Sequence, residues 1–143
     1  MKYAQEDLQR LHQELYRTLA EVIRVCEVCN IPYFIQGGSA IGALYNKGIV
    51  PWDDDIDVGM TRENYERFLR EAPALLGEGY VLQEFTTERD TPFYFAKVRK
   101  RGTRFVEREW VGMPIEEGIY IDIFPYDLVP DDEALRRKQR AKV

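Results

Sequence analysis

The sequence lacks the features of membrane, secreted and zinc-binding proteins. It has no apolar run near the length of about 18 residues that a membrane span needs. Its first residues contain no basic segment followed by an apolar one, so we expect no secretory signal and a cytoplasmic protein. The only histidine is His12, so Cys26 and Cys29 have no second Cys or His pair with which to complete a zinc site. We therefore interpret both cysteines as structural thiols.

Charge and composition describe a soluble globular chain. The 143 residues carry 20 basic and 25 acidic side chains, a formal charge of −5, so the surface should repel nucleic acid unless a cation mediates. Apolar residues make up 45% of the chain, enough for a core and too many for a disordered protein. We expect a single domain over 1–143. Its last helix is unfinished, so we expect either a chain that is truncated at its C-terminus or a naturally short protein.

Periodicity predicts an α/β fold. Apolar residues at spacings of three and four predict a long helix over 6–28. Shorter helices are expected after the possible caps Ser39 and Thr61, the second one limited by Pro73, and over 131–143. Strands are expected at 33–36, 53–59, 80–85, 93–99, 103–107 and 119–124. Because the last three lie close together in sequence, we predict helices packed on a mixed, partly antiparallel sheet.

A run of aspartates carries the strongest chemical signal. Asp53-Asp54-Asp55-Ile56-Asp57-Val58 alternates acidic and apolar residues, so a strand there would place Asp55 and Asp57 on one face. Asp122 has the same position between Ile121 and Ile123 on a later strand. Carboxylates this close repel by roughly 4 kcal/mol per pair at an effective dielectric near 20, and a cation would relieve that repulsion. The three carboxylates predict a site for two Mg²⁺ or Mn²⁺ ions.

Two other segments predict phosphate contacts. The Gly37-Gly38-Ser39 turn has no Cβ on its first two residues and precedes a helix, so a phosphate can approach its backbone N–H groups. Lys97 and Arg99 share one face of the expected strand 93–99 and could reach the same phosphate. They are equally compatible with ordinary edge-strand charges. Trp52 could stack on a base, but burial beside the acidic strand is the favoured interpretation.

The aspartate run has three other interpretations. An EF-hand loop beginning at Asp53 fails, because Val58 stands where glycine is needed and Asn64 where glutamate is needed. A D-x-D motif of a sugar-nucleotide glycosyltransferase also holds a metal against a diphosphate, but it does not explain the Gly-Gly-Ser turn or Asp122. A solvated acidic loop leaves the alternation with Ile and Val unexplained.

The motifs together resemble the LicD family, to which fukutin-related proteins are similar. The resemblance rests on Ile31-Pro-Tyr-Phe-Ile-Gln-Gly-Gly-Ser-Ala-Ile-Gly-Ala-Leu, Gly48-Ile-Val-Pro-Trp-Asp-Asp-Asp-Ile-Asp-Val and Gly118-Ile-Tyr-Ile-Asp-Ile-Phe-Pro. It implies a nucleotidyltransferase-like fold and transfer of a phosphorylated alcohol, such as phosphocholine, from a CDP-linked donor to a sugar hydroxyl of a cell-surface glycan. It further implies that Asp55, Asp57 and Asp122 bind metal and that Gly38 and Ser39 hold donor phosphates.

Two departures from the family pattern and two other functions remain open at this point. Tyr45 and Asn46 replace the Arg-His that commonly precedes Lys47-Gly48 in the family, and members usually extend well beyond the Phe-Pro block. The chain could instead transfer a nucleotidyl group to a small molecule, releasing pyrophosphate rather than CMP. It could also be a non-catalytic module that binds a nucleotide or metal.

Overall fold

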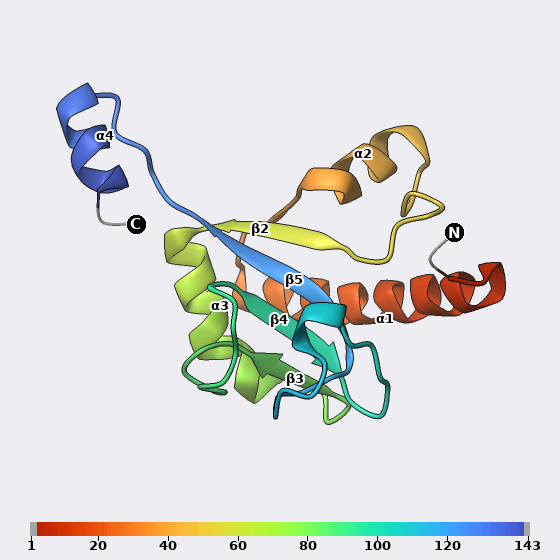
Figure 1. The fold of residues 1–143 in the computed structure, drawn as a ribbon. Coiled ribbons are helices and arrows are strands. Elements are labelled where there is room, and N and C mark those ends of the chain that lie inside the picture. The colour runs from red at the N-terminus through yellow and green to blue at the C-terminus, as the bar shows by residue number, and fades with distance from the viewer. Residues whose placement is uncertain (1–2, 142–143) are drawn as a thin grey trace.

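The fold is a mixed α/β arrangement around a five-stranded sheet (Figure 1). A computed structural model describes residues 3–141. In chain order the elements are α1 (Gln5–Cys29), β1 (Phe34–Ile35), α2 (Gly37–Tyr45), β2 (Asp57–Thr61), α3 (Arg62–Leu75), β3 (Tyr80–Gln83), β4 (Ala96–Lys100), the 3₁₀ helix η1 (Arg108–Trp110), β5 (Ile119–Tyr126) and α4 (Glu133–Arg140). This confirms the predicted fold class.

The sheet order is β1-β2-β5-β4-β3. Strands β2 and β5 are parallel, and the other three pairs are antiparallel. The predicted mixed sheet is therefore correct, but its single parallel pair joins two strands that are distant in sequence. That pair is important for function because it places the end of the aspartate run beside Asp122.

The core lies between the sheet and the helices α1 and α3. The long helix buries the predicted apolar stripe, including Leu15 and Val22. Alternate strand residues face it, among them Val58, Ile121 and Val98, which are fully buried. Period-two alternation then sends the intervening residues of the same strands to the opposite face. The aspartates of β2 and β5 lie on that second face.

The second face carries a row of polar residues across four strands. Asp57 on β2 is the register partner of Asp122 on β5, Asp122 is the partner of Lys97 on β4, and Lys97 is the partner of Gln83 on β3. Asp122, Lys97 and Gln83 are all buried. We call these four residues the polar row. Each buried member needs a partner, because an unpaired charge inside a protein is costly.

Several predicted boundaries were wrong. Residues 53–56 are not a strand, because β2 begins at Asp57. The expected strand 103–107 is also irregular, although the N–H of Phe105 donates to Glu117 O at 2.6 Å. Helix α2 begins at Gly37, so Ser39 is inside it and is not its cap. Pro73 was expected to limit the helix after Thr61, but it lies inside α3, which continues to Leu75.

The last helix stands apart from the sheet (Figure 1). It was predicted over 131–143, and the described part runs over Glu133–Arg140, with Asp132 as its cap. The Asp132 carboxylate accepts from Leu135 N at 2.9 Å. Residues 142–143 lie outside the described part of the chain. Among residues 3–141, no helix has the length and apolarity required to span a membrane.

Candidate active site

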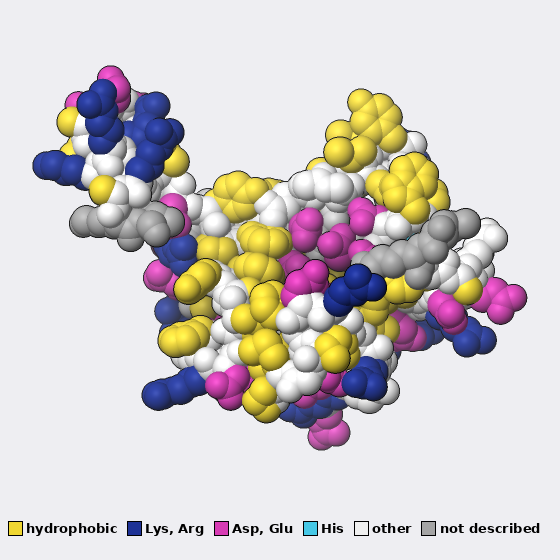
Figure 2. Space-filling model, viewed as in Figure 1, with side chains coloured by type: hydrophobic (Ala, Val, Ile, Leu, Met, Phe, Trp, Pro, Cys, Tyr) yellow, Lys and Arg dark blue, Asp and Glu magenta, His cyan; other side chains and the backbone are white. Residues whose placement is uncertain are grey.

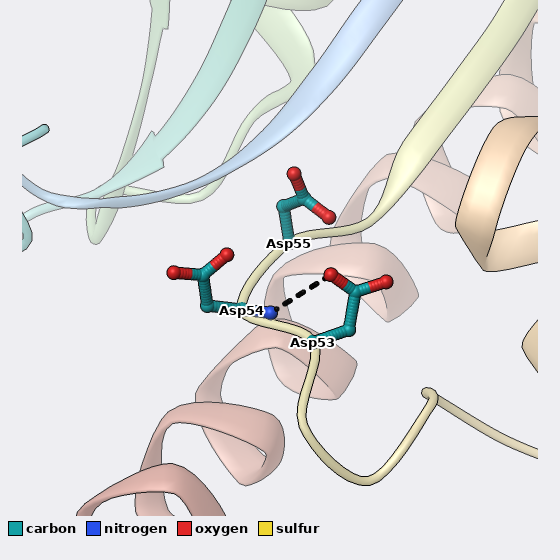
Figure 3. A group of neighbouring side chains, drawn as sticks. All are labelled: Asp53, Asp54 and Asp55. Carbon is teal, nitrogen blue, oxygen red and sulfur yellow. Dashed lines mark hydrogen bonds between the residues drawn. The ribbon is translucent and has the colours of Figure 1, made fainter. Parts of the chain in front are cut away.

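The acidic loop before β2 brings three carboxylates together. Asp53, Asp54 and Asp55 each offer an oxygen within 4.8 Å of the others (Figure 3). The loop is held by its backbone and by α1, since His12 Nε2 lies 2.7 Å from Asp53 O. Tyr3 adds a second tie, because its hydroxyl donates to Asp54 Oδ2 at 2.7 Å. A loop held in this way keeps its carboxylates close despite their repulsion.

The first turn of α2 lies directly against these carboxylates. A Cβ built on Gly38 would lie 2.9 Å from Asp53 Oδ2, and one built on Gly37 would lie 3.1 Å from Asp57 Oδ2. Gly37 also has a φ of +57°, a conformation that favours glycine. The backbone conformation therefore favours glycine at position 37, and the predicted Gly-Gly feature meets the carboxylate ends of the aspartate run in space.

Ser39 connects the same two elements. Its Oγ accepts a hydrogen bond from the backbone N–H of Asp57 at 2.9 Å. Ser39 is buried, so its hydroxyl fixes the beginning of β2 against α2. The N–H groups of the first turn of α2 have no side-chain cap. A helix N-terminus of this kind attracts anionic groups such as phosphates.

The polar row places the other predicted residues. Lys97 Nζ donates to Asp122 Oδ1 at 2.7 Å and lies 3.4 Å from Glu107 Oε2. It also lies 3.5 Å from the centre of the Tyr120 ring. The Lys97 side chain is 1% exposed, so its charge interacts with groups of the protein and not with solvent. The structure thus brings Lys97 to Asp122, one of the predicted metal ligands.

Burial and mutual repulsion raise the pKa values of the aspartates. Burial, then Asp57 and the other carboxylates, raise the pKa of Asp55 to about 7. Burial and Asp53 raise the pKa of Asp57, although Lys97 opposes the change. Burial raises the pKa of Asp122 to about 6 despite its ion pair with Lys97. Burial is thus the main cause of all three raised pKa values, and repulsion between the carboxylates adds to it.

The predicted residues do not all come together. Within residues 3–141, one group of three carboxylates has ligand atoms that all lie within 4.8 Å of one another, and it consists of Asp53, Asp54 and Asp55. The predicted trio of Asp55, Asp57 and Asp122 is less tightly grouped. Asp57 and Asp122 are neighbours through the sheet register. In a strand Asp54 would face away from Asp55, but that segment is not a strand, so this separation does not apply. Asp53 and Asp54 are therefore part of the site.

Arg99 lies behind the site. Its Nη1 donates to Gly118 O at 2.7 Å and its Nε to Gln83 Oε1 at 2.5 Å. It is 2% exposed. Both contacts link strands, which gives the guanidinium a structural role. The contact of Arg99 with a phosphate stays a prediction, and these hydrogen bonds do not support it.

Residues near the acidic loop were also missed or misplaced by sequence reasoning. Trp52 is 74% exposed, so the favoured buried position was wrong. Figure 2 shows acidic side chains gathered near the middle of this face, below the hydrophobic side chains of α2. Glu107 was overlooked as a site residue and was expected only as the end of the strand 103–107, which does not form. Nothing in its local sequence distinguishes it from other surface glutamates.

The fold and site together define an α/β domain whose acidic cluster adjoins a glycine-rich helix N-terminus. Comparison with known proteins gives the family. The sequence profile of the LicD/FKTN/FKRP nucleotidyltransferase domain matches residues 30–139. The chain belongs to this family, which confirms the resemblance predicted from its motifs. The matched range contains the acidic loop, the first turn of α2 and the polar row.

Two relatives illustrate the breadth of the family. The lipopolysaccharide cholinephosphotransferase LicD of Haemophilus influenzae is 35% identical over 115 residues, which cover 76% of this chain and 40% of the relative. The ribitol 5-phosphate transferase FKRP of Homo sapiens is 38% identical over 50 residues, 35% of this chain and 10% of the relative. The chain thus spans less than half the length of these relatives. Both names describe transferases.

Proposed function

We propose that this chain is a metal-dependent transferase that moves a phosphorylated alcohol from a CDP-linked donor to a sugar hydroxyl of a cell-surface glycan. The observation that carries the proposal is the meeting of the acidic loop with the first turn of α2 at Gly37 and Gly38. Family membership supports it, because the relatives are named as transferases of cholinephosphate and ribitol 5-phosphate.

The donor set fits Mg²⁺ or Mn²⁺. Hard divalent ions take carboxylate oxygens, and the loop offers three of them within 4.8 Å. Two ions are proposed, which Asp53, Asp55, Asp57 and Asp122 would hold. Ions bound there supply positive charge to a diphosphate and to the oxygen that leaves. The raised pKa of Asp55 agrees with this assignment, because burial and, after it, the neighbouring carboxylates disfavour a charged form that a cation would stabilise.

The remaining steps fall to the chain's own groups. The N–H groups at the start of α2, including those of Gly38 and Ser39, are proposed to hold donor phosphates, which the absence of a side-chain cap supports. Asp122 is proposed to orient the acceptor hydroxyl, and Lys97 keeps the Asp122 carboxylate in place. The acceptor oxygen then forms a bond to the distal phosphorus, the bond from that phosphorus to CMP breaks, and the hydroxyl proton is released.

Product analysis tests this function. The chain is incubated with CDP-choline, MgCl₂ and a glycan acceptor, and CMP is measured. We expect CMP release that disappears with EDTA and falls by at least about 100-fold in Asp57→Asn, the usual scale for loss of an electrostatic catalytic group. Asp131→Asn, which lies outside the site near α4, is the matched control. Pyrophosphate release from a nucleoside triphosphate would instead indicate nucleotidyl transfer and contradict the proposal.

A further inference from the structure

We propose that a row of aromatic side chains on the second face of the sheet binds a pyranose ring of the acceptor and presents its hydroxyl to Asp122. This inference rests on the proposed function, because it locates the acceptor of that reaction. The row consists of Phe34 on β1, Phe124 and Tyr126 on β5, and Phe95 immediately before β4. We call these four residues the aromatic row.

The sheet register brings these side chains together beside the polar row. Phe34 and Phe124 are the register partners of Gly59 on its two sides. Gly59 follows Asp57 by two residues and therefore faces the same side of the sheet. The ring centre of Phe95 lies 4.4 Å from that of Phe124. The aromatic row thus runs beside the polar row, two residues farther along β2 and β5.

Two rings of the aromatic row are held in place and remain accessible. The Phe34 ring lies over Gly59, since a Cβ built on that glycine would overlap it. The Tyr126 ring meets the Phe34 ring edge to face, with ring centres 4.9 Å apart, and its hydroxyl donates to Gln36 Oε1. Phe34 and Tyr126 are nevertheless 42% and 46% exposed. They form a fixed apolar surface that a ligand can reach.

Aromatic rings next to carboxylates match the chemistry of a sugar ring. A pyranose carries C–H groups on its faces, which pack on aromatic side chains, and hydroxyls around its edge, which donate to carboxylates. An open-chain polyol has no such face to place on a ring. The aromatic row carries no charge, so it offers a phosphate or another anion no partner. These properties select a neutral pyranose as the occupant.

The spacing also fits an acceptor. Phe124 follows Asp122 by two residues, a distance of about 7 Å along a strand. One sugar residue packed on the aromatic row therefore reaches the Asp122 carboxylate with a hydroxyl at its edge. Figure 2 shows hydrophobic side chains beside the acidic ones on this face, on the side toward α4.

A cavity on the other side of the polar row leaves the aromatic row to the acceptor. The cavity has a volume of about 730 Å³ and is lined in part by Asp55 and Tyr120. These residues precede Asp57 and Asp122 by two positions, whereas Phe124 follows Asp122 by two. Phosphoryl transfer places the attacking and leaving oxygens roughly in line, on opposite sides of the phosphorus. A donor that extends into the cavity therefore meets its acceptor from the side of the aromatic row.

Binding is tested first without any turnover. The methyl β-glycosides of glucose, galactose and N-acetylglucosamine are titrated into ¹⁵N-labelled protein, with D-glucitol as the open-chain control. We expect at least one glycoside to bind about 2- to 13-fold more tightly than glucitol, the range of an aromatic contact, and to shift the amides of Phe34, Gly59 and Tyr126. No preference over glucitol for any glycoside, or shifts confined to another surface, would overturn the inference even if the chain transfers phosphorylated alcohols.

Variants then locate the site. Phe34→Leu and Tyr126→Leu should each weaken binding of that glycoside about 2- to 13-fold, whereas Tyr126→Phe, which keeps the ring, should retain it. Phe85→Leu is the matched control, because Phe85 is 60% exposed and follows β3 at the opposite edge of the sheet. Two leucine variants are used so that a folding defect in one, detected by circular dichroism, leaves the other informative.

Three results with these variants would overturn the inference. The first is unchanged affinity in a folded leucine variant of either residue. The second is an equal loss in Tyr126→Phe and Tyr126→Leu, which would assign binding to the hydroxyl and not to the ring. The third is a dimer, detected by light scattering, that Phe34→Leu dissociates, because a second copy of the chain would then cover the aromatic row.

Turnover provides a second readout. With the glycoside that binds best as acceptor, its KM should rise about 2- to 13-fold in Phe34→Leu, and the KM for CDP-choline should not follow it. A rise in the KM for CDP-choline alone would assign the aromatic row to the donor, which would overturn the inference and leave the proposed transferase function intact. Absence of CMP release with every acceptor would contradict the proposed function, and the glycoside titration would still decide the inference.

Discussion

Lys97 and Asp122 are register partners on β4 and β5, and Lys97 Nζ donates to Asp122 Oδ1 at 2.7 Å. Both side chains are largely buried. On the other side of Asp122 the register continues to Asp57, where the acidic segment enters the sheet. A single lysine therefore stabilises the carboxylate that links the acidic loop to the middle of the sheet.

Replacement of this lysine should destabilise the fold. Lys97→Met leaves the Asp122 carboxylate buried without its cation, and removal of one partner from a buried ion pair costs about 3–5 kcal/mol. Urea unfolding at pH 7 measures the loss. Lys100→Met is the control, because its pair with Glu14 is more exposed and should contribute about 1 kcal/mol or less. Equal losses in the two variants would contradict the structural role of Lys97.

The metal-free protein should lose stability as pH rises. Asp55 and Asp122 have pKa values of about 7 and about 6 in the fold, above their ordinary value of 3.8. The folded state therefore keeps protons that the unfolded chain has already released, and its stability falls between about pH 4 and pH 7. Thermal unfolding in EDTA across this range measures the effect. A midpoint that rises over this window would show that the two carboxyl groups are ionised more easily than their burial implies.

Sequence periodicity found the elements more reliably than their ends. The stripe of α1 and the alternation of β5 repeat over many residues, and both elements form as predicted. The segment 53–56 has the same alternation as a strand, but it is irregular, and it is tied to β5 where Ile56 O accepts from Asp122 N at 3.1 Å. Alternation records which side chains are buried, and an extended loop held against the core produces the same pattern.

Only part of the site could be predicted from the sequence, for the same reason. The aspartate run, the two glycines and Asp122 are visible as local motifs. The pairing of Lys97 with Asp122 depends on the β4–β5 register, which joins residues 25 positions apart. Glu107 depends on an irregular segment that follows β4 and has no periodicity. The sequence motifs thus identified the acidic and glycine residues of the site. The charged residues that surround them, Lys97 and Glu107, could be identified only from the fold.

The first glycine of α2 should be sensitive to substitution. Gly37→Ala places a Cβ 3.1 Å from Asp57 Oδ2 at a φ of +57°, and the left-handed conformation alone costs about 1–2 kcal/mol. We expect that loss of stability in urea unfolding, together with weaker Mg²⁺ binding by calorimetry. Gly79→Ala is the matched control, since nothing lies within 4 Å of a Cβ there. Should both variants behave alike, the approach of the acidic segment to Gly37 would not constrain this residue.

Magnesium should stabilise the fold through the acidic cluster. Any ligand that binds the native state alone at 100 times its dissociation constant adds about 2.7 kcal/mol. Saturating MgCl₂ should therefore raise the unfolding midpoint at pH 8, and Asp55→Asn should remove most of that increase. In EDTA the same variant should be more stable than the wild type by about 1 kcal/mol, because it relieves repulsion between partly exposed carboxylates. Asp131→Asn controls for nonspecific screening, and an equal magnesium response in all three proteins would contradict the assigned site.

Substitution of Arg99 tests whether this residue has a structural role or makes the phosphate contact predicted from the sequence. Arg99→Met removes hydrogen bonds to Gly118 O and to Gln83 Oε1. Because each bond from a charged donor contributes about 1.5–3 kcal/mol, a loss of about 3–6 kcal/mol is expected. The neighbouring Arg101→Met is the control, since Arg101 is exposed on the turn after β4. Urea unfolding gives the stability, and steady-state kinetics at a temperature where the variant stays folded give KM for the donor. The buried contacts predict an unchanged KM, whereas a KM raised tenfold or more with little loss of stability would restore the phosphate contact.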